Sequence, residues 1–212
     1  MAALKDFRFA SAWALPAVVG LAAWRSPWAA WAVMLGIQVV LALIERATPR
    51  WRSPAAESAS RPWFAWCLRT HVVWQAALLA LGVFLAQEAA WPAVVALGLA
   101  VGGISGSQGI TFAHELGHSK SRADRFYAWL LMSSALYAHF MVEHYRGHHP
   151  RAATHDDPAS ARFGESLWRF LPRTLGGSLT NAWRLEARQL AQRRRGWPRS
   201  PLLWATLSQA AA

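Results

Sequence analysis

Four long apolar segments, separated by short basic stretches, constrain this chain more than any other feature of its sequence. A helix needs about 20 mostly apolar residues to cross the hydrocarbon core of a bilayer, with a range of about 17 to 25. The segments that approach or meet this length are Phe9–Trp24, Pro27–Ile44, Trp63–Ala86 and Ala89–Phe112. Lipid offers the backbone no hydrogen-bond partner, so segments of this kind cross it as helices. The sequence therefore predicts an all-α polytopic membrane protein with about four transmembrane helices.

Composition agrees with a membrane protein. Hydrophobic residues make up 54% of the 212 residues and charged residues only 16%, whereas soluble domains average about 25% charge. The net charge of +11 does not indicate a nucleic-acid partner, because basic loops between spans have a simpler cause in membrane orientation. The single cysteine, Cys67, excludes a disulfide framework and a cysteine-based metal site. We expect it to be a buried, inert thiol.

The distribution of positive charge predicts the orientation. Lys5 and Arg8 precede the first segment, and four more basic residues occupy the loop after the second: Arg46, Arg50, Arg52 and Arg61. Basic loops stay on the cytoplasmic side. We therefore expect residues 1–112 to form the spans in an inner membrane of bacterial type, with the N-terminus inside. Residues 113–195 should form a cytoplasmic cap, and residues 196–212 the start of an incomplete further span.

Five of the eight histidines lie in two short boxes, "HELGH" and "EHYRGHH". His114 and His118 are four residues apart, which places them on one face of a helix. His144 and His148 repeat this spacing, and His149 follows, rotated by about 100° on a regular helix. Imidazole suits iron, zinc, copper and nickel. Metal binding requires the neutral ring, so it should weaken in acid.

The HELGH box has a second interpretation. HExxH is also the motif of zinc peptidases, in which the glutamate is the general base. A second histidine box follows closely in this chain, and no later Asp-containing motif completes a membrane zinc site. A membrane zinc peptidase therefore remains only an alternative.

Three motifs carry a family resemblance: "HELGHS", "EHYRGHH" and "THDDPASARFGES". Over about residues 112–195 they resemble the integral-membrane alkane 1-monooxygenases, within the fatty acid desaturase and hydroxylase superfamily. The resemblance implies a non-haem di-iron site, O2 as co-substrate and hydroxylation of the terminal methyl of an alkane. It also implies electrons from a rubredoxin-type donor and its reductase. It assigns no catalytic residue beyond the iron ligands, which are His114, His118, His144, His148 and His149.

Three further residues are expected beside the ligands: Glu115, His139 and Glu143. The two glutamates are expected to accept from imidazole N–H groups, with direct iron ligation as the alternative, and His139 to orient a ligand. His139 matches a family histidine outside the ligand boxes. Asp156 and Asp157 are expected either to orient nearby histidine or arginine side chains or to face water. The substrate-binding residues are not identified by the sequence.

The chain departs from the family pattern downstream. The family has later histidines in NYxEHYG-like and HxxHH-like segments, and no histidine follows His155. The tail "PLLWATLSQAAA" begins an apolar run of about eleven residues, shorter than the roughly 17 that a span needs. We therefore expect an incomplete N-terminal part that is catalytically silent by itself. A non-catalytic fragment is one alternative, and a desaturase or other hydroxylase of hydrophobic substrates is another.

One apolar stretch, residues 124–142, is not expected to span the bilayer. A straight helix of this length would carry His144 about 28 Å away from His118, and the two boxes would share no metal. Basic residues flank the stretch on both sides, which also keeps both ends cytoplasmic. The sequence therefore predicts a re-entrant or interfacial helix pair, broken near Ser133 and Ser134.

Overall fold

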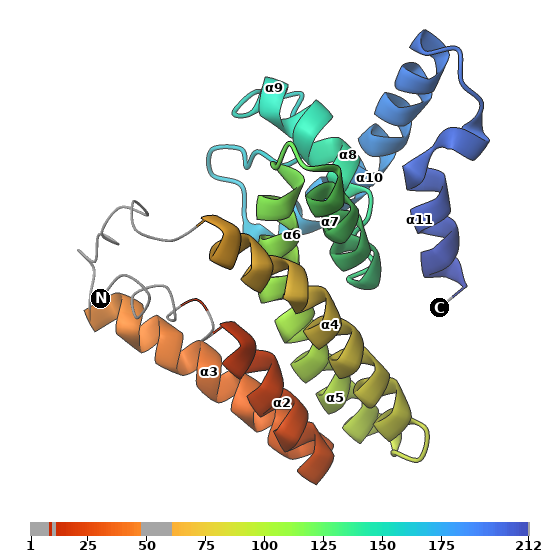
Figure 1. The fold of residues 1–212 in the computed structure, drawn as a ribbon. Coiled ribbons are helices and arrows are strands. Elements are labelled where there is room, and N and C mark those ends of the chain that lie inside the picture. Colours follow the sequence, from red (N-terminus) through yellow and green to blue (C-terminus); the bar gives the residue numbers. More distant parts are fainter. Residues whose placement is uncertain (1–8, 10–11, 48–60, 212) are drawn as a thin grey trace. The chain divides into compact units, whose positions relative to one another are not determined.

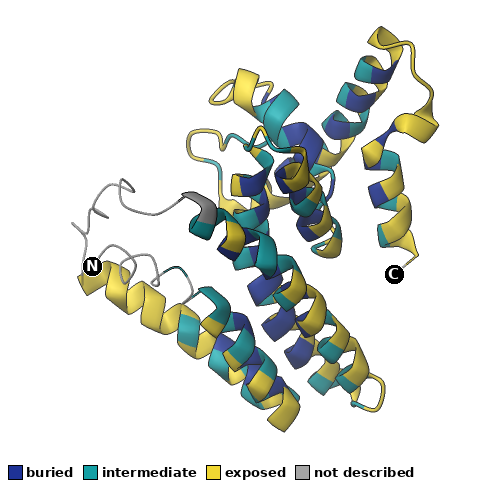
Figure 2. Cartoon of the chain, in the orientation of Figure 1, coloured by how far each residue is buried: buried dark blue, intermediate teal, exposed yellow. Residues whose placement is uncertain are grey.

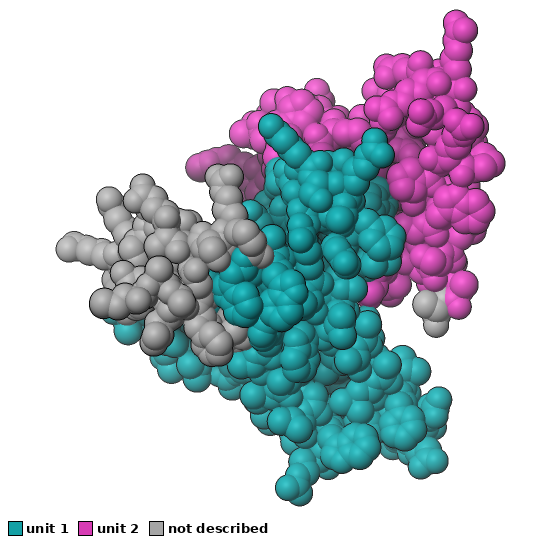
Figure 3. Space-filling model, in the orientation of Figure 1, with its two compact units in different colours: residues 1–131 teal, residues 132–212 magenta. Residues whose placement is uncertain are grey.

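The computed structural model describes residues 9, 12–47 and 61–211, with only the backbone at 61 and 62. In these ranges it contains helices and no strand, which confirms the all-α prediction. The chain divides into two compact units, residues 1–131 and 132–212 (Figure 3). Four of the basic residues used for the orientation lie outside the described residues: Lys5, Arg8, Arg50 and Arg52.

The first unit is built from antiparallel helices and one π-helical turn (Figure 1). In chain order its elements are α2 (Ala14–Arg25), α3 (Pro27–Ala47), α4 (Arg61–Ala86), α5 (Trp91–Ile104), η3 (Ser105–Gly109), α6 (Ile110–Gly117) and most of α7 (Arg122–Ser134).

Three helical runs of this unit are long and apolar enough to cross a membrane. They are Pro27–Ala47, Trp63–Ala86 and the continuous run Trp91–Gly117, which joins α5, η3 and α6. The first predicted span instead contains α2, a helix of 12 residues, shorter than the roughly 17 that a crossing needs. The last run extends past the predicted end at Phe112, because the π turn η3 continues the helix into the first histidine box. These helices make the chain a membrane protein.

The core of the first unit packs α2, α3, α4 and α5 together through small and aliphatic side chains. Ala30 and Ala100 are completely buried in it. A Cβ atom at Gly103 would lie 2.6 Å from the Met34 side chain, so this glycine lets α5 approach α3 closely. Gly103 therefore serves helix packing in the fourth predicted span. Cys67 is also buried, as expected.

The C-terminal half of α3 shows the opposite character, with apolar side chains exposed along several turns (Figure 2). Val39, Leu41, Leu43 and Ile44 are each more than half exposed. Apolar exposure on this scale marks contact with lipid or protein. On a helix of spanning length, it is the surface that hydrocarbon would cover.

The second unit begins in the last turn of α7 and holds the second histidine box. Its further elements are α8 (Phe140–Glu143), the π-helical turn η4 (His144–His148), α9 (His149–Arg151), α10 (Leu167–Gln192), the short 3-10 turn η5 (Trp197–Arg199) and α11 (Pro201–Ala210). Helix α10 packs against α8 and η4 and so supports the second box.

The stretch 124–142 is broken as predicted, because α7 ends at Ser134. Leu136 takes a left-handed conformation with φ of 55°. The Tyr137 N–H donates to the Met132 carbonyl at 2.8 Å, a six-to-one bond of the kind that closes a Schellman motif. With 13 residues, α7 is about 20 Å long, whereas the hydrocarbon core measures about 30 Å.

Candidate metal centre

The first box lies at the end of the long run Trp91–Gly117. His114 is in the last turns of α6, and His118 is its C-terminal cap. Their Nε2 atoms are 3.2 Å apart, and their ring centroids 4.6 Å apart. This is the i, i+4 pairing that the spacing predicts on a regular helix.

The loop that leaves the first box is fixed by Asp124 at the start of α7. Its carboxylate accepts from the Arg69 Nε atom at 2.5 Å and from the Ser119 hydroxyl at 2.6 Å. The Arg125 guanidinium donates to the carbonyls of Ser119 and Lys120, each at 2.9 Å. Burial opposes ionisation of Asp124, but the bonds from Arg69 and Ser119 outweigh it and lower the pKa of the carboxyl. The chain immediately after His118 is therefore held by α4 and α7.

The second box is wound differently. Residues His144 to His148 form a π turn, and the His149 N–H bonds to the His144 carbonyl five residues earlier. The Nε2 atoms of His144 and His149 are 2.9 Å apart. His144 and His148 instead have nearly parallel rings, with centroids 5.5 Å apart. The sequence paired His144 with His148 by regular helical spacing. In the π turn, whose i→i+5 bond brings residue five onto the same side, the closer contact of His144 is with His149, and the assignment of all three as ligands stays a prediction.

A carboxylate contacts the Nδ1 atom of the His148 ring. Its Nδ1 atom lies 2.8 Å from the Asp157 Oδ2 atom. Asp157 is buried, and it also accepts from the Ser160 hydroxyl at 2.5 Å and from the Ala159 N–H at 3.0 Å. Burial disfavours the charge, but these three hydrogen bonds together lower the pKa of Asp157. An ionised carboxylate at Nδ1 keeps the proton there and leaves the Nε2 lone pair able to bind a metal.

Glu143 is buried beneath the second box. A Cβ atom at Gly147 would collide with its carboxylate, so only glycine fits there. The carboxylate accepts from Asn181 Nδ2 at 2.6 Å and pairs with Arg151 Nη2 at 3.5 Å. Burial is the largest influence on Glu143 and raises its pKa, against the opposing effects of Asn181 and Arg151. A role for Glu143 towards a ligand imidazole stays a prediction.

The other two supporting residues have different surroundings. Glu115 is exposed on α6. The His139 ring is half-buried with an edge-on contact to Tyr137, the centroids being 4.6 Å apart. Its Nε2 atom has no hydrogen-bond partner among the described residues. Burial lowers the pKa of His139 and favours the neutral ring. Their expected roles beside the ligands stay predictions.

A second ionic contact ties η4 to α10. Arg146 Nη2 donates to the buried Glu186 Oε2 at 2.6 Å, and the buried Ser200 hydroxyl donates to Oε1 at 2.8 Å. The sequence did not single out Asn181 or Glu186. A signal was present, because both are polar positions on the side of α10 that carries the small buried residue Ala182.

The motif loop between α9 and α10 is clamped by Arg173. Its guanidinium makes two bonds to the Glu165 carboxylate, at 2.7 and 2.6 Å. It also donates to the carbonyls of Pro158 and Ser160, at 3.2 and 2.9 Å. Gly177 allows Pro158 to lie directly on α10, since a Cβ there would be 2.8 Å from the proline ring. The loop that carries Asp157 is therefore fixed by hydrogen bonds from Arg173 and by the packing of Pro158 on Gly177.

The two imidazole pairs fit metal binding by their own geometry. Two nitrogen ligands at right angles on one ion, each at about 2.1 Å, are about 3.0 Å apart. The observed separations of 3.2 Å and 2.9 Å, which are also hydrogen-bond distances between the two rings, are close to this value. A donor set of imidazoles with a carboxylate behind one ring suits intermediate transition metals, iron among them.

These features define a class: a helical membrane protein with two histidine boxes, each presenting a close imidazole pair. Comparison with known families agrees, because residues 89–212 match the model of the fatty acid desaturase family. The chain belongs to the fatty acid desaturase family.

Characterised relatives are similar over much of the chain. Alkane 1-monooxygenase 2 of Pseudomonas aeruginosa is 37% identical over 188 residues, which are 84% of this chain and 49% of that protein. Alkane 1-monooxygenase 1 of the same organism is 40% identical, over 66% of this chain and 36% of its own length. Alkane 1-monooxygenase of Pseudomonas putida is 39% identical, over 50% and 26% respectively. The chain thus spans about half the length of the first of these relatives and less than half of the other two.

Proposed function

We propose that this chain belongs to a membrane non-haem di-iron monooxygenase, which hydroxylates the terminal methyl of alkanes with O2 and electrons from a rubredoxin-type donor and its reductase. The observation that carries the proposal is the pair of imidazole contacts, at 3.2 Å and 2.9 Å, in the two boxes. The names of the relatives support the reaction class.

In this proposal the iron ligands are five histidines: His114, His118, His144, His148 and His149. When bound, iron would supply the activation of O2 that lets oxygen enter an unactivated C–H bond. The protein's part is to hold neutral imidazoles in place. Asp157 fixes the His148 tautomer through Nδ1.

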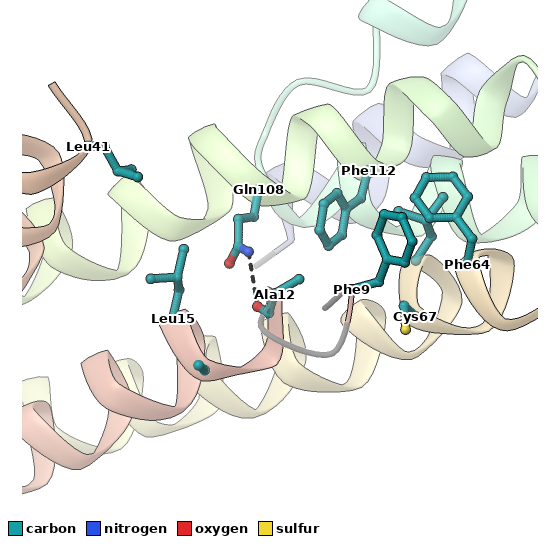
Figure 4. A pocket seen from close by; sticks show the side chains of 10 residues that line it. Phe9, Ala12, Leu15, Leu41, Phe64, Cys67, Gln108 and Phe112 are labelled. Carbon is teal, nitrogen blue, oxygen red and sulfur yellow. Dashed lines mark hydrogen bonds between the residues drawn. The ribbon is translucent and has the colours of Figure 1, made fainter. Parts of the chain in front are cut away.

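An apolar cavity in the first unit supports a hydrophobic substrate (Figure 4). It has a volume of about 580 Å³ and lies among aromatic and aliphatic side chains, including Phe9, Phe64 and Phe112. Phe112 is two residues before His114 on the same helix. Gln108 contributes a polar group at the wall and donates to the Ala12 carbonyl at 3.0 Å. We infer that an alkyl chain enters this cavity from the bilayer and that its apolar walls exclude water.

The reaction is tested by expressing the full reading frame that contains this sequence. Membranes loaded with iron and supplied with NADH, rubredoxin reductase and rubredoxin should convert octane to 1-octanol, as measured by gas chromatography and mass spectrometry. An alkene from a fatty acyl substrate, without alcohol from octane, would favour the desaturase that the family name suggests. Stoichiometric zinc with peptidase activity would replace the proposal altogether.

We also propose that both boxes face the cytoplasm at the inner membrane. The proposal rests on the basic residues around the boxes and on the broken helix between them. Cysteine labelling tests it at two exposed positions, Lys120→Cys and Ala152→Cys. A membrane-impermeant maleimide should label both in inverted vesicles and neither in intact cells. Labelling from opposite sides would contradict the proposal.

A further inference from the structure

Helix α10 exposes an apolar stripe along one side. Leu171, Leu175 and Leu179 are 38%, 48% and 45% exposed, and Trp168 beside them is 81% exposed. The three leucines are spaced by four residues, so they form one continuous row over two turns of the helix. A row of this size is unusual on a water-facing helix and marks an interaction surface.

The side of α10 that packs against the protein is polar instead. Three of its five buried residues are polar, Thr174, Ser178 and Glu186, beside the apolar Ala182 and Leu190, and Glu186 is paired with Arg146. A surface helix of a soluble domain has the reverse arrangement, with apolar residues inside and polar residues outside. The exposed surface of α10 that carries the leucine row is therefore adapted to an apolar surrounding.

Charge around the stripe indicates what covers it. The exposed arginines Arg169, Arg184 and Arg188 lie on α10, and the run 193–195 follows directly after it. The one acidic residue of α10 is the buried Glu186. Leu175 and Arg184 are nine residues apart, which places them on opposite sides of the helix, about 180° apart. Arginine opposite leucine, with tryptophan at one end, is the pattern of a helix that lies in the plane of a bilayer surface.

We propose that α10 lies in the interface of an anionic membrane. Its row of leucines is buried at the boundary between the headgroups and the acyl chains, and its arginines contact the acidic headgroups. Basic side chains are attracted to the negative surface potential of an anionic leaflet, so the three exposed arginines favour this position. The helix would then anchor the support of the second histidine box to the membrane surface. This inference is independent of the reaction proposed above.

The test uses the full chain, reconstituted in vesicles of phosphatidylcholine and phosphatidylglycerol at three to one. In a Cys67→Ala background, one variant carries Leu175→Cys and a matched control carries Thr180→Cys, on the exposed polar side. Both are labelled with an environment-sensitive nitrobenzoxadiazole dye. The label at 175 should be quenched at least threefold more by a lipid with a shallow spin label than by iodide, and the label at 180 should show the reverse.

Each other outcome overturns the proposal. Equal iodide quenching at both positions would place the stripe in water. Protection of position 175 from both quenchers would show a protein segment over it, and self-quenching between labelled chains would show a second copy. Replacing phosphatidylglycerol by phosphatidylcholine should at least halve the lipid quenching at 175. An unchanged value would exclude the role of the arginines.

Discussion

The two histidine boxes begin with the same spacing and are built differently. The first lies on a regular helix, so His114 and His118 pair at i and i+4. The second lies on a π turn, so His144 pairs with His149 at i and i+5. In the first box Glu115 and His118 are exposed, and Asp124 fixes the loop that follows the box. The second is surrounded by buried carboxylates. Spacing in the sequence thus brings histidines close together along the chain, while the local winding decides which of their rings come into contact.

The largest effect should come from removing one member of each close pair. His118→Ala and His149→Ala should each reduce bound iron per chain by at least tenfold, since each removes a nitrogen ligand. Iron is measured by mass spectrometry on the purified protein. His155→Ala, in an exposed loop, is the matched control and should change little. His71 is a poorer control, because its side chain is fully buried and truncation would disturb packing.

The pairing within the second box can be tested directly. If the π turn determines the pairing, His149→Ala should cost more iron than Asp157→Asn. The latter keeps a polar group beside His148 but removes the charge that fixes its tautomer. Loss of such a supporting partner typically costs about 10- to 100-fold in metal affinity. Asp156→Asn, the exposed neighbour, should leave the affinity unchanged. Equal losses for the two asparagine variants would show that the contact to His148 is unimportant.

A smaller effect is expected on stability. Arg146→Met leaves Glu186 buried without its guanidinium partner. Because Arg146 is itself partly exposed, we expect a loss on the order of 2 kcal/mol in the free energy of unfolding. Thermal melting followed by tryptophan fluorescence in detergent measures it. Arg184→Met, an exposed arginine of the same helix, is the control, and a similar shift for both would show that the buried pair contributes nothing.

The smallest effect concerns the loop and depends on pH. Hydrogen bonds from Arg173 and from the Arg162 backbone lower the pKa of Glu165 to about 2. Because the folded-state pKa lies below the ordinary value, the stabilisation is complete above pH of about 4.5. It is lost as the pH falls through the folded pKa of about 2. Glu165→Gln should therefore lower the melting temperature slightly at pH 6, and the difference from the unmodified chain should vanish near pH 2. A constant difference across this range would contradict the assignment.

Most of the fold could be predicted because its signals are local. Apolar run length predicted the spanning helices, and α4 ends at the predicted residue, Ala86. Serine residues in an otherwise apolar stretch marked the break that ends α7 at Ser134. The first predicted span was less well determined. The helix described in it, α2, begins at Ala14 and has 12 residues.

The supporting residues of the second box could not be predicted from local patterns. Glu143 meets Asn181 across 38 residues, and Arg146 meets Glu186 across 40. A π turn and an α turn have the same composition, and the choice between them depends on the contacts that surround the extra residue. Regular helical periodicity therefore predicted that His148 would lie closest to His144. In the structure His149 makes that close contact.

The sequence by itself determined the membrane class of the protein, its helical architecture and the five histidines that make metal binding chemically reasonable. Run length, charge and side-chain chemistry are properties of the chain before it folds. Tertiary structure alone decided that His144 pairs with His149, that Asp157 binds His148, and that Gly147 makes room for the buried Glu143. These outcomes depend on distances of a few ångströms between side chains, which are fixed only when the helices pack.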